Sequence, residues 1–182
     1  MAGQRLTDKT ALTSNLASDD KLMVVDTSDT TGSSAGTSKK VDSKFVIQTD
    51  KVSVASGIFQ AMDSSGGAGT FATLVAAPGA GLFIQPISIS VMVDYFSGTQ
   101  SAKVTLYFGY DTSTSSAYYA GITGFMQGKT ADINYATSAN ETPSALGGAG
   151  GLTDRGFFVY SAGNYSSTFS ADFYITYQIV TV

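Results

Sequence analysis

The chain has 182 residues, of which 43% are hydrophobic and only 13% charged, and its formal net charge is -4. It contains no cysteine, histidine or tryptophan, which excludes disulfide frameworks, thiolate or imidazole metal sites and nucleophiles activated by histidine. The negative charge disfavours nucleic-acid binding through a basic surface, and no apolar stretch is long enough to span a membrane. We therefore expect no metal, no cofactor and no nucleic-acid or membrane partner.

Charge divides the chain into two regions. Residues 1–52 hold seven of the ten basic residues and seven aspartates, whereas residues 53–182 hold three basic and seven acidic residues. The first region is also poor in large apolar side chains, so burial alone would not offset the entropy lost on ordering it. The sequence predicts an attachment arm over 1–52, ordered against another molecule, and a folded body over 53–182.

Within the arm, two short strands are expected. Residues 21–26 (KLMVVD) form an apolar run between polar residues, which indicates a strand. Residues 27–38 are rich in Ser, Thr, Gly and Asp and predict a loop, and residues 39–42 (KKVD) predict a second strand before an apolar segment at 45–47. The aspartates of this region are more typical of turns and caps than of a calcium site.

The body is predicted to be a mainly β, antiparallel sandwich or jelly roll. Two segments, 82–96 and 168–182, alternate apolar and polar residues with the period of a half-buried strand. A shorter one at 103–108 repeats the pattern, and weaker strands are expected at 70–75, 118–122 and 157–160. In the segment 82–96 one face is expected to hold Ile87, Ile89, Val91, Val93 and Tyr95.

The last segment leaves apolar side chains on its outward face. Tyr174, Val180 and Val182 alternate with the residues expected in the core. Two explanations stay open: a subunit interface around a symmetry axis, or a second sheet packed over this face.

Residues 6–29 (LTDKTALTSNLASDDKLMVVDTSD) resemble a recurring N-terminal pattern of structural proteins of tailed bacteriophages. Residues 39–46 (KKVDSKFV) fit the second half of that pattern, and residues 75–87 (VAAPGAGLFIQPI) are similar to phage head-fibre and receptor-binding sequences. The resemblance implies an arm that docks on the virion before a trimeric, β-rich body. The residues expected to dock are Arg5, Leu6, Lys9, Leu12, Leu16, Leu22, Val24, Lys39, Lys40, Val41 and Phe45.

Four tyrosines are candidates for outward-facing contacts with a receptor or glycan, because tyrosine gives contact area at a low entropy cost. They are Tyr118, Tyr119, Tyr135 and Tyr165. The alternative is that these side chains are half-buried residues at the rim of the sandwich.

Catalysis has one conceivable route, a pair of aspartates acting on a glycan, since glutamate occurs only at Glu141. The body candidates are Asp94, Asp111, Asp132, Asp154 and Asp172. Nothing in their spacing pairs them, so we expect the chain not to be an enzyme.

Taken with the resemblance, these features predict a virion protein, either a head fibre or a capsid decoration, that the arm anchors to the major capsid protein or another virion protein. A homotrimer would multiply modest single contacts into high avidity. The alternative functions are a tail-fibre or receptor-binding protein that recognises a host surface glycan or other polymer, and an aspartate-based glycan hydrolase.

Overall fold

The computed structural model describes residues 21–32, 34–42, 46–62, 71–110, 118–137 and 152–181. The chain forms two compact units, residues 1–46 and residues 47–182. The expected boundary after Val52 therefore falls inside the second unit, because residues 48–54 are hydrogen-bonded into its sheet.

The described part of the first unit is a two-stranded antiparallel hairpin, made of β1 (Lys21–Asp26) and β2 (Thr37–Asp42). Both strands were expected from the sequence, and the polar residues between them form the loop. The predicted docking residues Arg5, Leu6, Lys9, Leu12, Leu16 and Phe45 lie outside the described residues.

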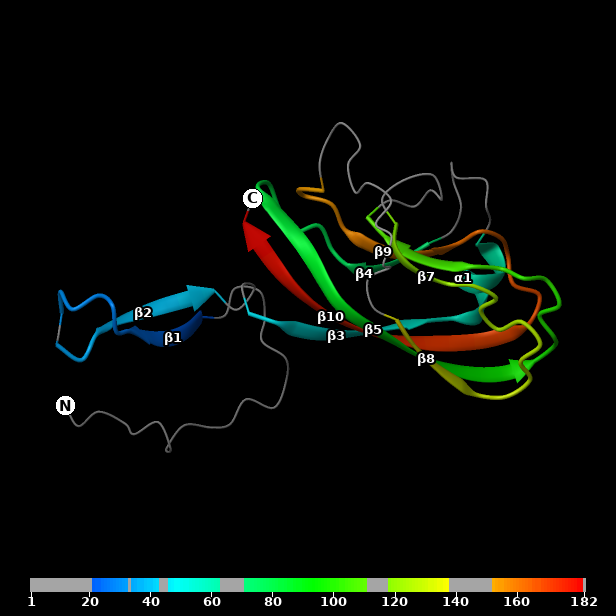
Figure 1. Cartoon of the computed structure of the whole chain (residues 1–182). Coiled ribbons are helices and arrows are strands. Elements are labelled where there is room, and N and C mark those ends of the chain that lie inside the picture. The colour runs from blue at the N-terminus through cyan, green and yellow to red at the C-terminus, as the bar shows by residue number, and fades with distance from the viewer. Residues whose placement is uncertain are drawn as a thin grey trace. The chain divides into compact units, whose positions relative to one another are not determined.

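The second unit is a sandwich of two four-stranded antiparallel sheets (Figure 1), so the expected mainly β fold is confirmed. In the long-strand sheet the order is β3 (Gln48–Val54), β10 (Thr168–Thr181), β5 (Leu82–Ser97) and β8 (Ile133–Thr137). In the short-strand sheet it is β4 (Ala72–Val75), β9 (Phe157–Ser161), β6 (Leu106–Gly109) and β7 (Tyr118–Ile122).

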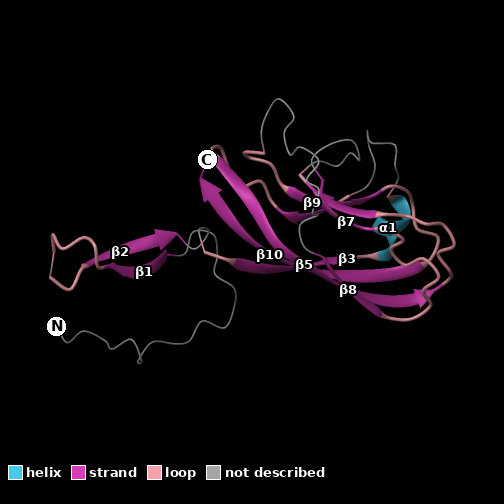
Figure 2. Ribbon diagram, viewed as in Figure 1, coloured by secondary structure: helices cyan, strands magenta, loops and turns pink. Residues whose placement is uncertain are grey.

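Strands dominate the body in Figure 2, where the described chain has one short helix, α1 (Ser56–Ala61). A helix of six residues is not stable by itself in water, and α1 is held by Phe59, whose side chain is fully buried. No helix in the described ranges is long and apolar enough to cross a membrane.

The core lies between the two sheets and is rich in phenylalanine. Phe59 contacts Phe169 and Phe173 of β10, with ring centroids 4.5 and 6.2 Å apart, and Phe173 meets Phe108 of β6 edge to face. Along β10 the side chains alternate between buried and half-buried, as the period of the sequence predicts. The second sheet thus covers the Phe169 face of β10, and Tyr174 lies on the opposite face.

One strand departs from its predicted alternation. Ile87 was expected in the core with Ile89, yet 41% of it is exposed, whereas Ile89 is fully buried. The cause is an irregularity in the pairing with β10, where Thr176 pairs with Ser88 but Tyr177 pairs with Pro86. Ile87 is therefore left out of the register, and its side chain falls on the other face.

Candidate attachment surface

The register of the hairpin places its side chains on two opposite faces. Residues that pair across an antiparallel ladder lie on the same face. The Leu22 face consists of Leu22, Val24, Asp26, Thr37, Lys39 and Val41, and the described side chains of the Met23 face are Met23, Val25, Ser38 and Lys40.

Two aspartates shape the loop at one end of the hairpin. The hydroxyl and the N–H of Ser28 both donate to Asp26 Oδ1, at 2.6 and 3.0 Å, and those of Thr31 donate to Asp29 Oδ1 at 2.6 and 3.1 Å. Asp26 and Asp29 are thus turn formers. At Gly36, φ is +110°, and a Cβ would lie 2.7 Å from the carbonyl oxygen of Asp26, so this position requires glycine.

Lys39 joins the loop to the hairpin. Its Nζ lies 2.8 Å from Asp26 Oδ2 and 2.9 Å from Asp29 Oδ2. The Lys39 ammonium and the Ser28 hydroxyl lower the pKa of Asp26 to about 2, and the Thr31 hydroxyl and Lys39 lower the pKa of Asp29 to about 2. The two aspartates in turn raise the pKa of Lys39. The three side chains carry one net negative charge on the Leu22 side of the hairpin.

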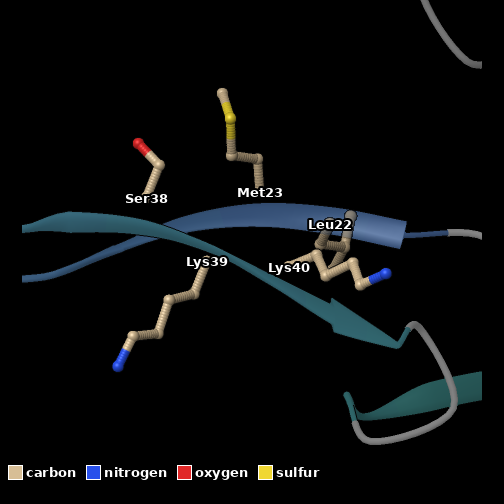
Figure 3. A pocket seen from close by; sticks show the side chains of 5 residues that line it. All are labelled: Leu22, Met23, Ser38, Lys39 and Lys40. Atoms are coloured by element: carbon tan, nitrogen blue, oxygen red, sulfur yellow. The ribbon is translucent and has the colours of Figure 1, made fainter. Parts of the chain in front are cut away.

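Both faces of the hairpin expose apolar side chains. Met23 is 78% exposed, Val25 58% and Val24 41%. Figure 3 shows Met23 and Ser38 extending to one side of the hairpin and Lys39 to the other. A shallow recess of about 350 Å³ lies along the hairpin between Leu22, Met23, Ser38, Lys39 and Lys40.

The structure brings most of the described docking candidates together on one face. Leu22, Val24, Lys39 and Val41 share the Leu22 face, whereas Lys40 lies on the Met23 face. Lys39 is engaged by aspartates of its own chain, which reduces its value as a contact for an acidic partner. The sequence interpretation missed Met23 and Val25, although their alternation with Leu22 and Val24 in β1 indicates a second apolar face.

The tyrosines proposed as outward contacts serve the fold where the structure describes them. Tyr165 is only 3% exposed, and its ring packs edge to face on Phe59, Phe125 and Phe169, so the prediction that it faces outward is wrong. Burial raises the pKa of its hydroxyl. Tyr165 lies in the connection between β9 and β10, whose neighbouring residues Asn164 and Ser166 are exposed while the tyrosine ring is buried in the aromatic core.

Tyr119 and Tyr135 are half-buried, as in the alternative interpretation. The Tyr119 hydroxyl donates to the carbonyl oxygen of Pro86 at 2.9 Å, and the Tyr135 hydroxyl accepts from the N–H of Met126 at 3.2 Å. Burial raises the pKa of Tyr135. Tyr118 is the first residue of β7, and its side chain is not among those that the structure describes.

Three of the five aspartates considered for catalysis have structural partners. Asp172 pairs with Lys51 at 2.8 Å, which lowers its pKa, while Asp132 and Asp154 accept backbone N–H groups of Tyr95 and Gly79. Asp111 and Glu141 lie outside the described residues. Within the described ranges no group of three carboxylates could hold a metal ion.

Comparisons with known proteins do not show a family for this chain. No family model matches the chain, and no curated protein matches it. One solved structure, described as a marine algae virus of the order Picornavirales, is 11% identical and is matched over 99% of this chain and 88% of that chain, with a TM-score of 0.25. A TM-score this low carries no argument about the fold or the function.

Proposed function

We propose that the chain is a non-enzymatic structural protein of a bacteriophage virion, a head fibre or capsid decoration, whose N-terminal arm anchors it to the major capsid protein or another virion protein. The β-sandwich body projects from this anchor, and the assembled protein is a homotrimer. The resemblance of residues 6–29 and 39–46 to phage structural proteins supports the assignment to a virion.

The observation that carries the proposal is the hairpin. A two-stranded hairpin is marginally stable at best in water, and this one exposes apolar side chains on both faces. It belongs to a unit separate from the body, whose core is complete without it. An exposed apolar surface of this kind is typical of a segment that is covered in a larger assembly.

The test compares the full chain with a variant lacking residues 1–46 in their binding to particles purified without the protein. The full chain should bind, and the shortened chain should stay folded, as measured by circular dichroism, but remain in the supernatant on sedimentation. The shortened chain keeps all of β3, so loss of binding would not reflect loss of the body. Equal binding of the two chains would overturn the proposal.

Recognition of a host polymer by the body is not advanced as a second function. Its support came from the tyrosines, of which Tyr165 is buried and Tyr119 and Tyr135 use their hydroxyls inside the fold.

A further inference from the structure

We infer that the hairpin is an assembly element in which the Leu22 face of one copy packs on the Met23 face of the next copy. The inference deepens the proposed function, from which it takes the number of copies, but the contact between copies can be tested without any particle.

The first argument is that two opposite faces need covering. Val24 on one face and Met23 and Val25 on the other are 41%, 78% and 58% exposed. A flat partner surface would cover one face and leave the other in water. Copies of the same hairpin stacked face on opposite face would cover both.

The second argument is charge complementarity. On the Leu22 side, Asp26 and Asp29 share the single cation Lys39, so that side carries one net negative charge. The register places Lys21, Lys40 and Asp42 on the Met23 face, which gives that face one net positive charge, and Lys40 is the one of the three whose side chain the structure describes. Stacking unlike faces brings Lys40 of one copy toward the carboxylates of the next, whereas stacking like faces would oppose charges of the same sign.

The geometry of such a contact is heterologous, because each copy offers two different surfaces. Three copies closed around an axis would bury three equivalent contacts, consistent with the proposed homotrimer. Each contact is small, so closure of the ring supplies the stability that a single pair of hairpins lacks.

Cysteine cross-linking distinguishes packing of unlike faces from packing of like faces. The native chain has no cysteine, so only the introduced thiols react. Met23→Cys places a thiol on the Met23 face and Val24→Cys places one on the Leu22 face. The two full-length variants carry tags of different size and are produced both separately and together. A third chain carries both substitutions. Each sample is then treated with a short bis-maleimide. Lys129→Cys, an exposed position in the body, measures cross-linking by random collision.

Stacking of unlike faces predicts cross-links between the two single variants when they are produced together, and covalent trimers from the doubly substituted chain. Neither single variant alone should cross-link above the Lys129→Cys background. Cross-linking of either single variant with itself would mean that like faces pack together and would overturn the inference. Background cross-linking in every sample would overturn it as well, because the hairpin would then be covered by something other than its copies.

A charge variant gives a second readout. Lys40→Glu should raise the concentration at which the assembly half-dissociates, measured by sedimentation velocity, by about fivefold, the upper end of what one exposed ion pair contributes. Lys129→Glu makes the same charge change in the body and should leave that concentration unchanged. An unchanged assembly with Lys40→Glu would contradict the stacking. If the hairpins cross-link as expected but the full chain does not bind to particles, that result counts against the proposed attachment alone.

Discussion

The hydroxyl of Tyr110 donates a hydrogen bond to the carbonyl oxygen of Ile84, and the hydroxyl of Tyr119 donates one to Pro86. Both acceptors lie on β5 beyond the residues 89–93 that pair with β8. A strand segment without a neighbour leaves backbone groups to be satisfied in another way. Here two tyrosines from the opposite sheet provide the donors, and Pro86 has no N–H to satisfy.

Tyr110→Phe should therefore destabilise the body by about 1–3 kcal/mol, because it leaves the Ile84 carbonyl without its donor in a buried setting. Tyr110 is 2% exposed and its ring packs on Phe83 and Phe157, contacts that phenylalanine would keep. The measurement is urea unfolding followed by circular dichroism. Tyr119→Phe is the matched control and should cost less, since water can reach a half-buried hydroxyl. Equal losses would contradict this account.

At the scale of the element, the hairpin is stabilised by electrostatics in addition to its ladder of backbone hydrogen bonds. The pKa of Asp26 and that of Asp29 are about 2, below the usual 3.8, so the charged carboxylates stabilise the folded hairpin. The sign follows from the lowered values: this stabilisation is complete above about pH 4 and is lost as the pH falls toward 2. Both carboxyls are exposed, so salt should weaken the effect.

Lys39→Gln should raise the pKa of Asp26 more than that of Asp29. The reason is that Lys39 is the main partner of Asp26, whereas Asp29 is held chiefly by the hydroxyl of Thr31. Carboxyl carbon shifts followed by NMR between pH 1 and 6 would measure both values. Lys40→Gln, on the opposite face, should change neither. A larger rise at Asp29 than at Asp26 would refute the assignment of partners.

At the scale of the whole molecule, the division between the two units determines which truncations fold. β3 pairs with β10 along residues 48–54 and gives the core Val54, and the hydroxyl of Tyr177 donates to Asp50 at 2.8 Å. Lys51 in the same strand pairs with Asp172. The strand is therefore part of the body, although it follows the arm directly.

A chain beginning at residue 47 should unfold at nearly the same temperature as the body of the full chain. One beginning at residue 53 should melt much lower or aggregate, because the edge of β10 and part of the core lose their cover. Differential scanning calorimetry of the two truncated chains would measure the difference. Similar transitions in both would mean that β3 contributes little to the body.

The pattern of single residues was enough to predict the β class, the hairpin strands and the two long strands β5 and β10, because alternation with period two is a local property of a half-buried strand. The same pattern could not reveal β3, where Gln48 and Asp50 occupy positions on the inward face, or the single turn of α1, which only burial of Phe59 stabilises.

What the amino-acid sequence determined by itself was therefore the kind of secondary structure and the inventory of chemical groups. The tertiary structure alone decided that residues 47–52 belong to the body, that Ile87 turns outward and that Tyr165 turns inward. Each of these depends on which distant strand lies alongside, since register shifts and edge pairing arise from contacts between residues far apart in the chain. The pairing of Lys39 with its own aspartates has the same origin, because the loop brings together groups that are separated along the sequence.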